Sequence, residues 1–264
     1  MDYIKFLGTG GARIVVSKQL RASGGIWLSL KGTNIYLDPG PGALVRCTSS
    51  RPSLDPTKLD AIILSHKHLD HSSDVNVMIE AMTEGGFKKR GILFAPEDAL
   101  SDDPVVLKYV RKYLKEIQIL EEGKSYHVGN ISFSTPLRHI HGDVQTYGLN
   151  FEASPYRLSF ITDTRFFSKL LECYRGEVLI INVVRLKKSN LDHLCIDDVK
   201  RIIKEVHPKV AILTHFGMTI LRAKPWKIAE EMQNELGTKV IAATDGMKFN
   251  LEGITNGEDH RLHC

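Results

Sequence analysis

The chain has 264 residues, of which 42% are hydrophobic and 25% charged, a balance that permits a sizeable buried core and excludes global disorder. The net charge of +4 suits an anionic substrate but is too small to indicate a nucleic-acid-binding protein. The apolar runs are far shorter than the roughly twenty residues that span a bilayer, and the first residues lack the pattern of a signal peptide. We therefore expect a cytoplasmic protein without a membrane segment.

Short apolar runs typical of buried strands alternate with helical patterns along the chain. Strands are predicted, in chain order, at residues 4–7, 26–30, 34–37, 61–64, 158–162, 178–182 and 210–213, with a hairpin turn at 31–33. Helices are predicted at 104–119 and 196–206. The pattern favours one α/β layered domain over residues 1–264, with two sheets and a frayed polar tail at 256–264.

The four cysteines are scattered without the short spacings of a disulfide frame or a zinc ribbon, which favours a reducing compartment. The glycines of Gly8-Thr9-Gly10-Gly11 follow the first predicted strand. A dinucleotide-binding fingerprint would need glycine where Arg13 stands, so we interpret this segment as a tight turn and not as a phosphate-binding loop.

The densest group of potential metal ligands is Ser65-His66-Lys67-His68-Leu69-Asp70-His71, directly after the predicted strand 61–64. If the chain stays extended there, His66 and His68 point to the same side, because strand side chains alternate. Asp70 and His71 would then begin a turn or helix. Imidazole suits zinc, iron or manganese, and a carboxylate adds a harder ligand. The cluster predicts a site for one or two metal ions.

Further candidate ligands stand where other predicted strands end. Asp163 follows the run 158–162 and His215 follows the run 210–213, so both could converge on the same edge. Asp163 could instead cap a helix at 165–171, and His215 could be a hydrogen-bonded core histidine. His139 and His141, two residues apart and expected on one side of a strand, are both candidates for the remaining histidine ligand.

The H-x-H-x-D-H cluster, a later histidine, an aspartate and a final histidine resemble the metallo-β-lactamase superfamily. The segments Phe6–Gly11 and Tyr36–Gly40 are also similar to the first strands of that family. The resemblance implies a four-layer αββα sandwich and a hydrolase with two divalent metal ions, zinc first and manganese or iron as alternatives. By position it assigns His66, His68 and His141 to one metal, Asp70, His71 and His215 to the other, and Asp163 to both. His141 is preferred to His139 because relatives place this histidine shortly before an aromatic-glycine pair, here Tyr147-Gly148.

Two segments are similar to the phosphodiesterase branch of this superfamily. Asp192-His193-Leu194-Cys195 resembles a histidine segment of transfer-RNA 3′-processing nucleases, and Thr244-Asp245-Gly246-Met247 resembles the phosphoribosyl cyclic phosphodiesterase of phosphonate breakdown. The resemblance implies a binuclear-metal phosphodiesterase that attacks a small cyclic or nucleotide-like phosphodiester with a metal-bridged hydroxide. Asp70 would orient that hydroxide and His193 would protonate the leaving alkoxide.

The chain departs from the nuclease pattern in two ways, and the second departure favours a small anionic substrate over nucleic acid. The cysteine-rich insert of some relatives is absent after Gly11, and only 22 positions separate His141 from Asp163, which leaves no room for a long RNA-binding arm. The alternatives are an RNA-processing nuclease with a reduced arm, a thioester or lactone hydrolase on the same metal core, and a non-catalytic scaffold. A homodimer remains open.

Three further features each allow two interpretations. Asp38 either hydrogen-bonds a metal-bound histidine or forms a turn with Pro39 and Gly40. His193 is either an acid catalyst or a polar residue at a helix start. The basic stretch Arg185, Lys187 and Lys188 either attracts a phosphate or is a solvated loop.

Overall fold

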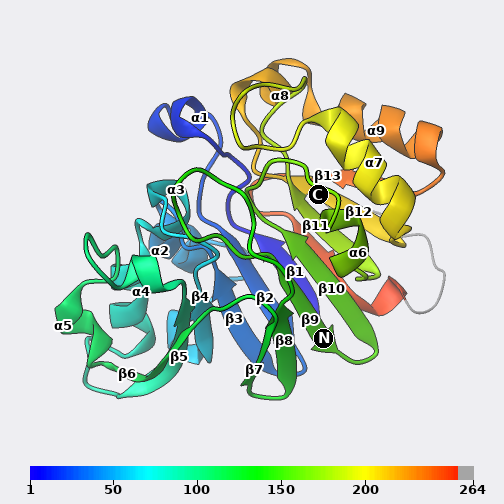
Figure 1. Cartoon of the computed structure of the whole chain (residues 1–264). Coiled ribbons are helices and arrows are strands. Elements are labelled where there is room, and N and C mark those ends of the chain that lie inside the picture. Colours follow the sequence, from blue (N-terminus) through cyan, green and yellow to red (C-terminus); the bar gives the residue numbers. More distant parts are fainter. Residues whose placement is uncertain (255–264) are drawn as a thin grey trace.

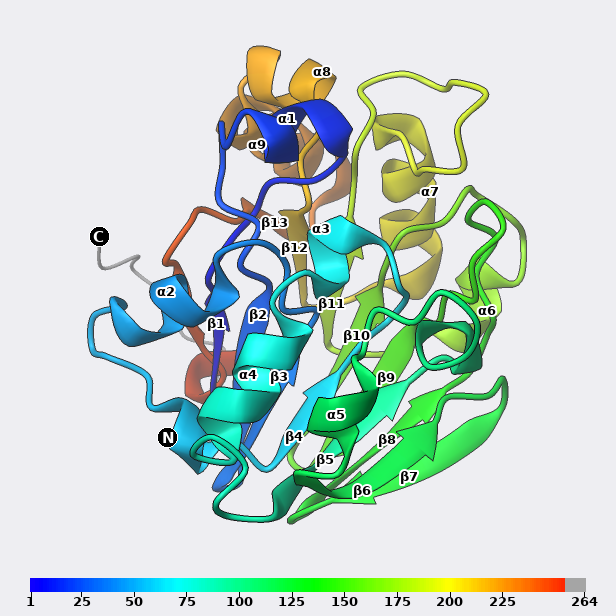
Figure 2. The ribbon, with the colours of Figure 1, turned by 90° about the vertical axis from the view of Figure 1, so that its left-hand side faces the viewer.

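The computed structural model describes residues 1–254, and the tail predicted to fray at 256–264 lies outside them. Two seven-stranded sheets pack face to face, and helices cover the outer face of each (Figures 1 and 2). The four-layer αββα sandwich implied by the resemblance is therefore confirmed. Apart from limits that differ by one or two residues, every strand predicted above is present.

The first sheet is antiparallel at one end and parallel at the other, because β3 to β6 all run the same way. Its strands, in spatial order, are β14 (Lys248–Asn250), β1 (Tyr3–Phe6), β2 (Ile26–Leu30), β3 (Thr33–Leu37), β4 (Ala61–Ile63), β5 (Arg90–Ala95) and β6 (Leu114–Ile119). The predicted hairpin turn joins β2 to β3 through Lys31 and Gly32, which both have positive φ as in a type I′ turn.

The second sheet repeats this plan, with antiparallel strands β7 to β10 and parallel strands β10 to β13. Its strands, in spatial order, are β13 (Lys239–Ala242), β12 (Val210–Thr214), β11 (Val178–Asn182), β10 (Tyr156–Ile161), β9 (Leu149–Ala153), β8 (Ile131–Thr135) and β7 (Lys124–Val128).

The helices lie on the outer faces and at the edge where the parallel strands end (Figures 1 and 2). They are α1 (Arg13–Ser17), α2 (Ala43–Thr48), α3 (Leu69–Ser72), α4 (Val75–Met82), α5 (Lys108–Arg111), α6 (Leu170–Cys173), α7 (Ile196–Val206), α8 (Met218–Arg222) and α9 (Pro225–Leu236). Helix α7 begins and ends as predicted, with Asp197 and Asp198 in its first turn. No helix within residues 1–254 is long and apolar enough to cross a membrane.

Three buried apolar clusters hold the layers together. The largest lies between the sheets and joins, for example, Phe6 and Phe94 of the first sheet to Phe133 and Ile180 of the second. A second cluster packs the outer face of the second sheet against α6, α7, α8 and α9, and a third packs the first sheet against α2, α4 and α5. Both faces of the central strands are therefore buried, which is why those strands read as continuous apolar runs.

The predicted helix at 104–119 is wrong. Only Lys108–Arg111 are helical, and Leu114–Ile119 form β6, which pairs with β5 in parallel. The apolar residues Leu114, Ile117 and Ile119 suit either a helix face or a strand, and pairing with the free edge of β5 decides in favour of a strand. Its edge position explains the exposed, charged Lys115 and Glu116, which are typical of edge strands.

Candidate metal centre

The carboxyl ends of five parallel strands meet at one edge of the sandwich and bring the candidate ligands together. The residues at or just after these ends are Asp38 (β3), His66 (β4), Asp163 (β10), Asn182 (β11) and His215 (β12). Ligand sites in α/β sheets commonly form at this edge, because the loops that follow the strands converge there.

The first group of ligand atoms comes from His66, His68 and His141, whose nitrogens lie within 4.8 Å of one another. The Nε2 atom of His141 is 3.0 Å from Nδ1 of His68. The other nitrogen of His141, Nδ1, is 2.9 Å from the main-chain carbonyl of Asp192 and donates to it. That bond places a proton on Nδ1 and leaves Nε2 as the ring atom that faces the group.

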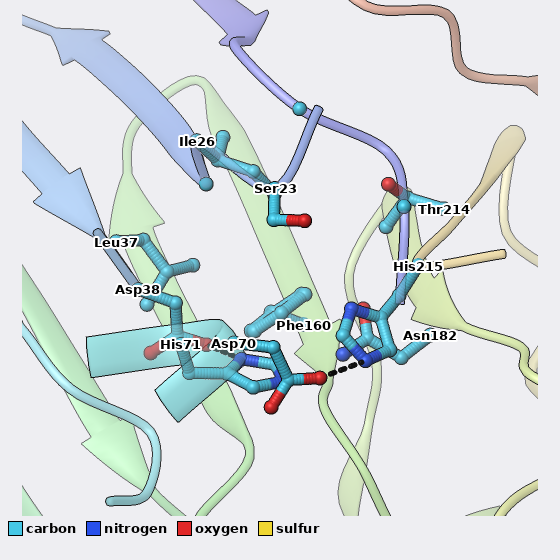
Figure 3. A pocket seen from close by; sticks show the side chains of 13 residues that line it. Ser23, Ile26, Leu37, Asp38, Asp70, His71, Phe160, Asn182, Thr214 and His215 are labelled. Carbon is cyan, nitrogen blue, oxygen red and sulfur yellow. Dashed lines mark hydrogen bonds and ion pairs between the residues drawn. The ribbon is translucent and has the colours of Figure 1, made fainter. Parts of the chain in front are cut away.

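The second group comes from Asp70, His71 and His215. An Asp70 carboxylate oxygen lies 3.6 Å from Nε2 of His215 and 3.9 Å from Nε2 of His71, and the three side chains point toward one another (Figure 3). Asp70 is 19% exposed whereas the rings are almost fully buried, so the carboxylate lies on the solvent side of this group.

Asp163 lies between the two groups. Its Oδ2 atom is within 3.3 to 3.7 Å of a ring nitrogen of each of four histidines: His71, His141, His193 and His215. Burial alone would raise the pKa of Asp163, but the nearby His215 and His193 overcome that effect and hold its pKa well below the ordinary value. Asp163 is therefore an ionised carboxylate, although only 3% of the residue is exposed.

These residues fit two bound cations. The Nε2 atoms of His66, His71 and His215 are buried and have no hydrogen-bond partner within residues 1–254. Burying a polar atom without a partner costs about 1 to 3 kcal/mol, so three such atoms at one place indicate a site for a bound ligand. Burial also lowers the pKa of His66 well below its ordinary value, which keeps that ring neutral and its lone pair free.

The charge on His71 supports the same conclusion. Burial alone would lower its pKa, but the carboxylates of Asp70 and Asp38 raise it well above the ordinary value. The two carboxylates thus stabilise a positive charge at His71. Without a metal ion, a proton on the His71 ring provides that charge. A metal ion bound here would neutralise the same carboxylates and would displace that proton.

Asp38 fixes the orientation of His71. Its carboxylate accepts hydrogen bonds from His71 Nδ1 at 2.9 Å, from the Ser65 main-chain N at 2.6 Å and from the Ser65 hydroxyl at 2.6 Å. Asp38 thus bonds a histidine of the second group and also forms the expected turn, because its carbonyl accepts a bond from Gly40 N and its φ of 53° is left-handed. Ser65 was not singled out from the sequence, although it directly precedes the histidine cluster.

Asn182 is a second supporting residue that the sequence reasoning missed. Its side-chain amide donates to Asp163 Oδ1 at 2.9 Å, which leaves Oδ2 directed at the four histidines. Asn182 is the last residue of β11, so the strand-end rule that selected Asp163 and His215 would have found it as well. An amide is a rarer metal ligand than imidazole or carboxylate, so the residue type alone gives little signal.

The expectation that His139 and His141 share one side of a strand is wrong. Only an isolated bridge from Arg138 to Tyr147 precedes them, and the chain then turns at Gly142 with φ of 55°. Their rings consequently have different partners: His139 Nε2 lies 2.6 Å from the Tyr174 hydroxyl, whereas His141 lies in the first group.

The alternative interpretations of Asp163 and His215 do not hold. Helix α6 begins only at Leu170, with Lys169 as its N-cap, so Asp163 does not cap it. The Nε2 atom of His215 faces the carboxylates of Asp70 at 3.6 Å and Asp163 at 3.3 Å, so the ring belongs to the ligand groups and not to the apolar core.

The loop predicted to be a tight turn holds His215 in place. The main-chain N of Phe216 donates to Thr9 O at 2.7 Å, and Gly11 N donates to Phe216 O at 3.1 Å. A Cβ on Gly11 would lie 2.3 Å from Cδ2 of His215, so only glycine leaves room for the ring. Asp245 ties this loop down by accepting hydrogen bonds from Thr9 N at 2.9 Å and from its hydroxyl at 2.7 Å.

His193 lies beside the two groups, with its ring centroid 4.8 Å from that of His141 and its Nδ1 atom 3.7 Å from Asp163 Oδ2. It does not start a helix, because Cys195 is the N-cap of α7. Burial lowers the pKa of His193 to about 4, so the ring is neutral near pH 7.

In the loop between β11 and α7, which contains the basic stretch, Lys187 and Lys188 are exposed and Arg185 is half-buried.

A cavity of about 30 Å³ lies on the inner side of the second group, between the sheets, and Ser23, Phe160 and Thr214 are among the residues that line it (Figure 3). It is about large enough for one water molecule. A molecule larger than water therefore cannot reach the ligand groups from this side, and must approach from the solvent side, where Asp70 and His193 are partly exposed.

Comparisons with known proteins agree with this geometry. Residues 33–216 match the family model described as the beta-lactamase superfamily domain. An uncharacterised protein of Methanocaldococcus jannaschii, MJ1374, is 31% identical over 258 residues, which cover 94% of each chain. The metallo-beta-lactamase fold protein YhfI from Bacillus subtilis aligns with a TM-score of 0.78 and 18% identity over 94% of this chain and 98% of that one.

A structure described as a new diphosphatase from the PhnP family aligns with a TM-score of 0.69 and 22% identity, over 94% of this chain and 96% of that one. The family model covers well over half of the chain, and its matched segment includes all seven residues assigned above to metal ions. The chain therefore belongs to the metallo-β-lactamase superfamily, as its histidine cluster indicated.

Proposed function

We propose that this chain is a metal-dependent hydrolase that binds two divalent metal ions and cleaves a small phosphodiester. The observation that carries the proposal is the placement of two three-residue ligand groups around one shared, ionised carboxylate. The ligands would be His66, His68 and His141 for one ion, Asp70, His71 and His215 for the other, and Asp163 for both.

The donor set favours zinc, with manganese or iron as alternatives, because imidazole and carboxylate ligands suit these ions. When bound, two such ions lower the pKa of a water molecule toward neutrality and stabilise negative charge that develops on phosphate oxygens. The similarity in fold to a diphosphatase is consistent with phosphate chemistry.

The partly exposed residues of the centre supply the remaining functions. The Asp70 carboxylate faces the solvent side and would accept a hydrogen bond from the attacking water, which orients its lone pair toward phosphorus. His193 is neutral near pH 7, so it must take up a proton before it can donate one. The anionic phosphodiester beside it favours that protonated form, and the proton would then pass to the leaving alkoxide.

Elemental analysis combined with a diester assay tests the proposal. Purified protein should hold close to two transition-metal ions per chain, His66→Ala or His68→Ala should lose at least one, and the loaded protein should hydrolyse bis(p-nitrophenyl) phosphate. Protein that takes up neither zinc nor manganese would indicate a scaffold. Loaded protein that cleaves thioesters or lactones but no diester would overturn the phosphodiesterase assignment.

The role of His193 has its own test, because the same ring could also bind metal together with His141 and Asp163. His193→Ala should keep both metals and should lower kcat by about two to four powers of ten for an alkyl leaving group. A p-nitrophenolate leaves without a proton, so a diester with that leaving group should lose much less. An equal loss for the two diesters, or loss of metal, would exclude His193 as the proton donor.

A further inference from the structure

A cleft of about 550 Å³ opens beside the first ligand group, a volume typical of small-molecule sites. One wall is formed by α3 and the start of α4, and the other by the loop at 101–107. His68 lines the cleft and is also a member of the first group, so the two sites share one side chain. A substrate whose phosphorus lies at the ligand groups could therefore extend one of its two ester arms into this cleft.

Hydrogen bonds within the protein hold both walls in shape. The Asn76 amide donates to the Val105 carbonyl at 2.9 Å, and its oxygen accepts from Leu107 N at 2.8 Å, which fastens the loop to α4. The Ser72 hydroxyl makes bonds of 2.9 and 3.0 Å to the main-chain carbonyls of Lys67 and His68. The cleft is thus formed before a ligand arrives, which reduces the entropic cost of binding.

Lys67 is the one cationic side chain among the residues that line the cleft. Its side chain is 24% exposed, and its Nζ atom lies 3.9 Å from a carboxylate oxygen of Asp103. The Asp103 side chain is fully exposed, and an ion pair of this length to such a partner is weak. The Lys67 ammonium group is therefore available to an anion that enters the cleft, whereas the Asn76 and Ser72 side chains already have partners.

We propose that this cleft binds the non-reacting arm of the substrate and that Lys67 recognises an anionic group on that arm, a phosphate or a carboxylate. Leu69, Pro104 and Val105 supply an apolar surface for the carbon skeleton between the two anionic groups. The preferred substrates would then be phosphodiesters with a second negative group on one arm. Asp103 competes for the same ammonium group and weakens the binding of that anion.

The inference rests on the proposed phosphodiesterase activity and is tested with three p-nitrophenyl phosphodiesters that differ only in the second arm: ethyl, 2-carboxyethyl and 2-phosphoethyl. Metal-loaded wild-type protein should show a KM for the charged arms about tenfold below that for the ethyl arm, because a charged hydrogen bond to a partly buried lysine is worth about that factor. The comparison of carboxylate with phosphate identifies the preferred anion.

Three variants separate this effect from a general disturbance. In Lys67→Ala the ratio of the KM for the ethyl arm to the KM for the charged arms should fall toward one, with metal content unchanged. In Asp103→Ala the ratio should increase about two- to threefold, because the competing carboxylate is gone. Lys88→Ala removes a lysine that pairs with Glu84 on the surface and should leave the ratio unchanged.

A binding measurement gives a second readout. Inhibition or calorimetry with 2-hydroxyethyl phosphate, the free arm, should show about tenfold weaker binding to Lys67→Ala than to wild type. Equal KM values for all arms in wild type, or a ratio that Lys67→Ala leaves intact, would overturn the inference while the phosphodiesterase proposal stands. Failure of the wild type to cleave any of the three diesters would instead remove the proposed function itself.

Discussion

Replacing Asp38 by Asn should weaken metal binding although Asp38 belongs to neither ligand group. The Asp38 carboxylate accepts from the Ser65 main-chain N on one oxygen, and from the Ser65 hydroxyl and His71 Nδ1 on the other. Asparagine has one oxygen, so if that oxygen keeps the main-chain bond, an NH₂ group faces His71 Nδ1. The ring must then move its proton to Nε2, the atom that lies 3.6 Å from Asp163 and would bind the metal.

The size of the effect follows from what such supporting bonds contribute elsewhere. Loss of a partner that orients a metal-bound histidine typically costs 10- to 100-fold in metal affinity, which corresponds to about 1.4 to 2.8 kcal/mol. We expect a loss in this range for zinc, measured by competition with a chelating dye. Nitrogen NMR of the histidine rings should show the His71 proton on Nε2 in metal-free Asp38→Asn.

The matched control is Asp60→Asn. Asp60 also accepts a main-chain hydrogen bond, from Asn34 N at 2.8 Å, but it lies before β4, at the opposite end of the strand from the ligand groups. This variant should lower thermal stability without changing zinc affinity. Wild-type affinity in Asp38→Asn, or an equal loss in Asp60→Asn, would refute the tautomer argument.

Three other predictions follow from single contacts. His141→Ala should lose metal far more readily than His139→Ala, because only His141 lies in a ligand group; elemental analysis after dialysis decides, and equal retention contradicts it. Gly11→Ala should displace the ring of His215 and reduce metal content to about one ion per chain, whereas an unchanged content of two would show that the ring can shift without loss. Burial, and to a smaller extent the charge of the nearby Asp55, raises the pKa of the Cys47 thiol from 9.0 to about 12. Iodoacetamide at pH 8 should therefore label Cys47 only after unfolding. The folded state keeps the Cys47 proton to a higher pH than the unfolded state does. The stability that Cys47 contributes should therefore decline as pH rises from 9.0 toward about 12, which denaturant titrations at several pH values can detect.

The sequence predicted which side chains come together in the two groups, because their positions depend on local rules. His66 and His215 each follow a continuous apolar run, and such runs in parallel strands end at one edge of a sheet. The family resemblance then selected His141 over His139, a choice that the residues alone left open. The structure places His141 in the first group and turns His139 toward Tyr174.

The errors and omissions come from interactions between distant segments. Residues 114–119 form a strand because the edge of β5 is free to pair with them. The local sequence of this segment does not show that such an edge lies nearby. Ser65 and Asn182 act through hydrogen bonds to Asp38 and Asp163, partners that only the folded chain brings within reach. The cleft beside His68 likewise depends on the loop at 101–107, which lies far from the histidine cluster in sequence.

The contact between the glycine loop and His215 also bears on the order of events during synthesis. The loop that holds His215 is translated well before His215 itself, but it is fastened by Asp245, and β1 pairs with β14 near residue 250. The H-x-H-x-D-H segment therefore leaves the ribosome long before the second ligand group can close. Under the proposed function, His66 and His68 would be available to an ion early, whereas an ion at the second group would have to wait until the segment around Asp245 has emerged and folded.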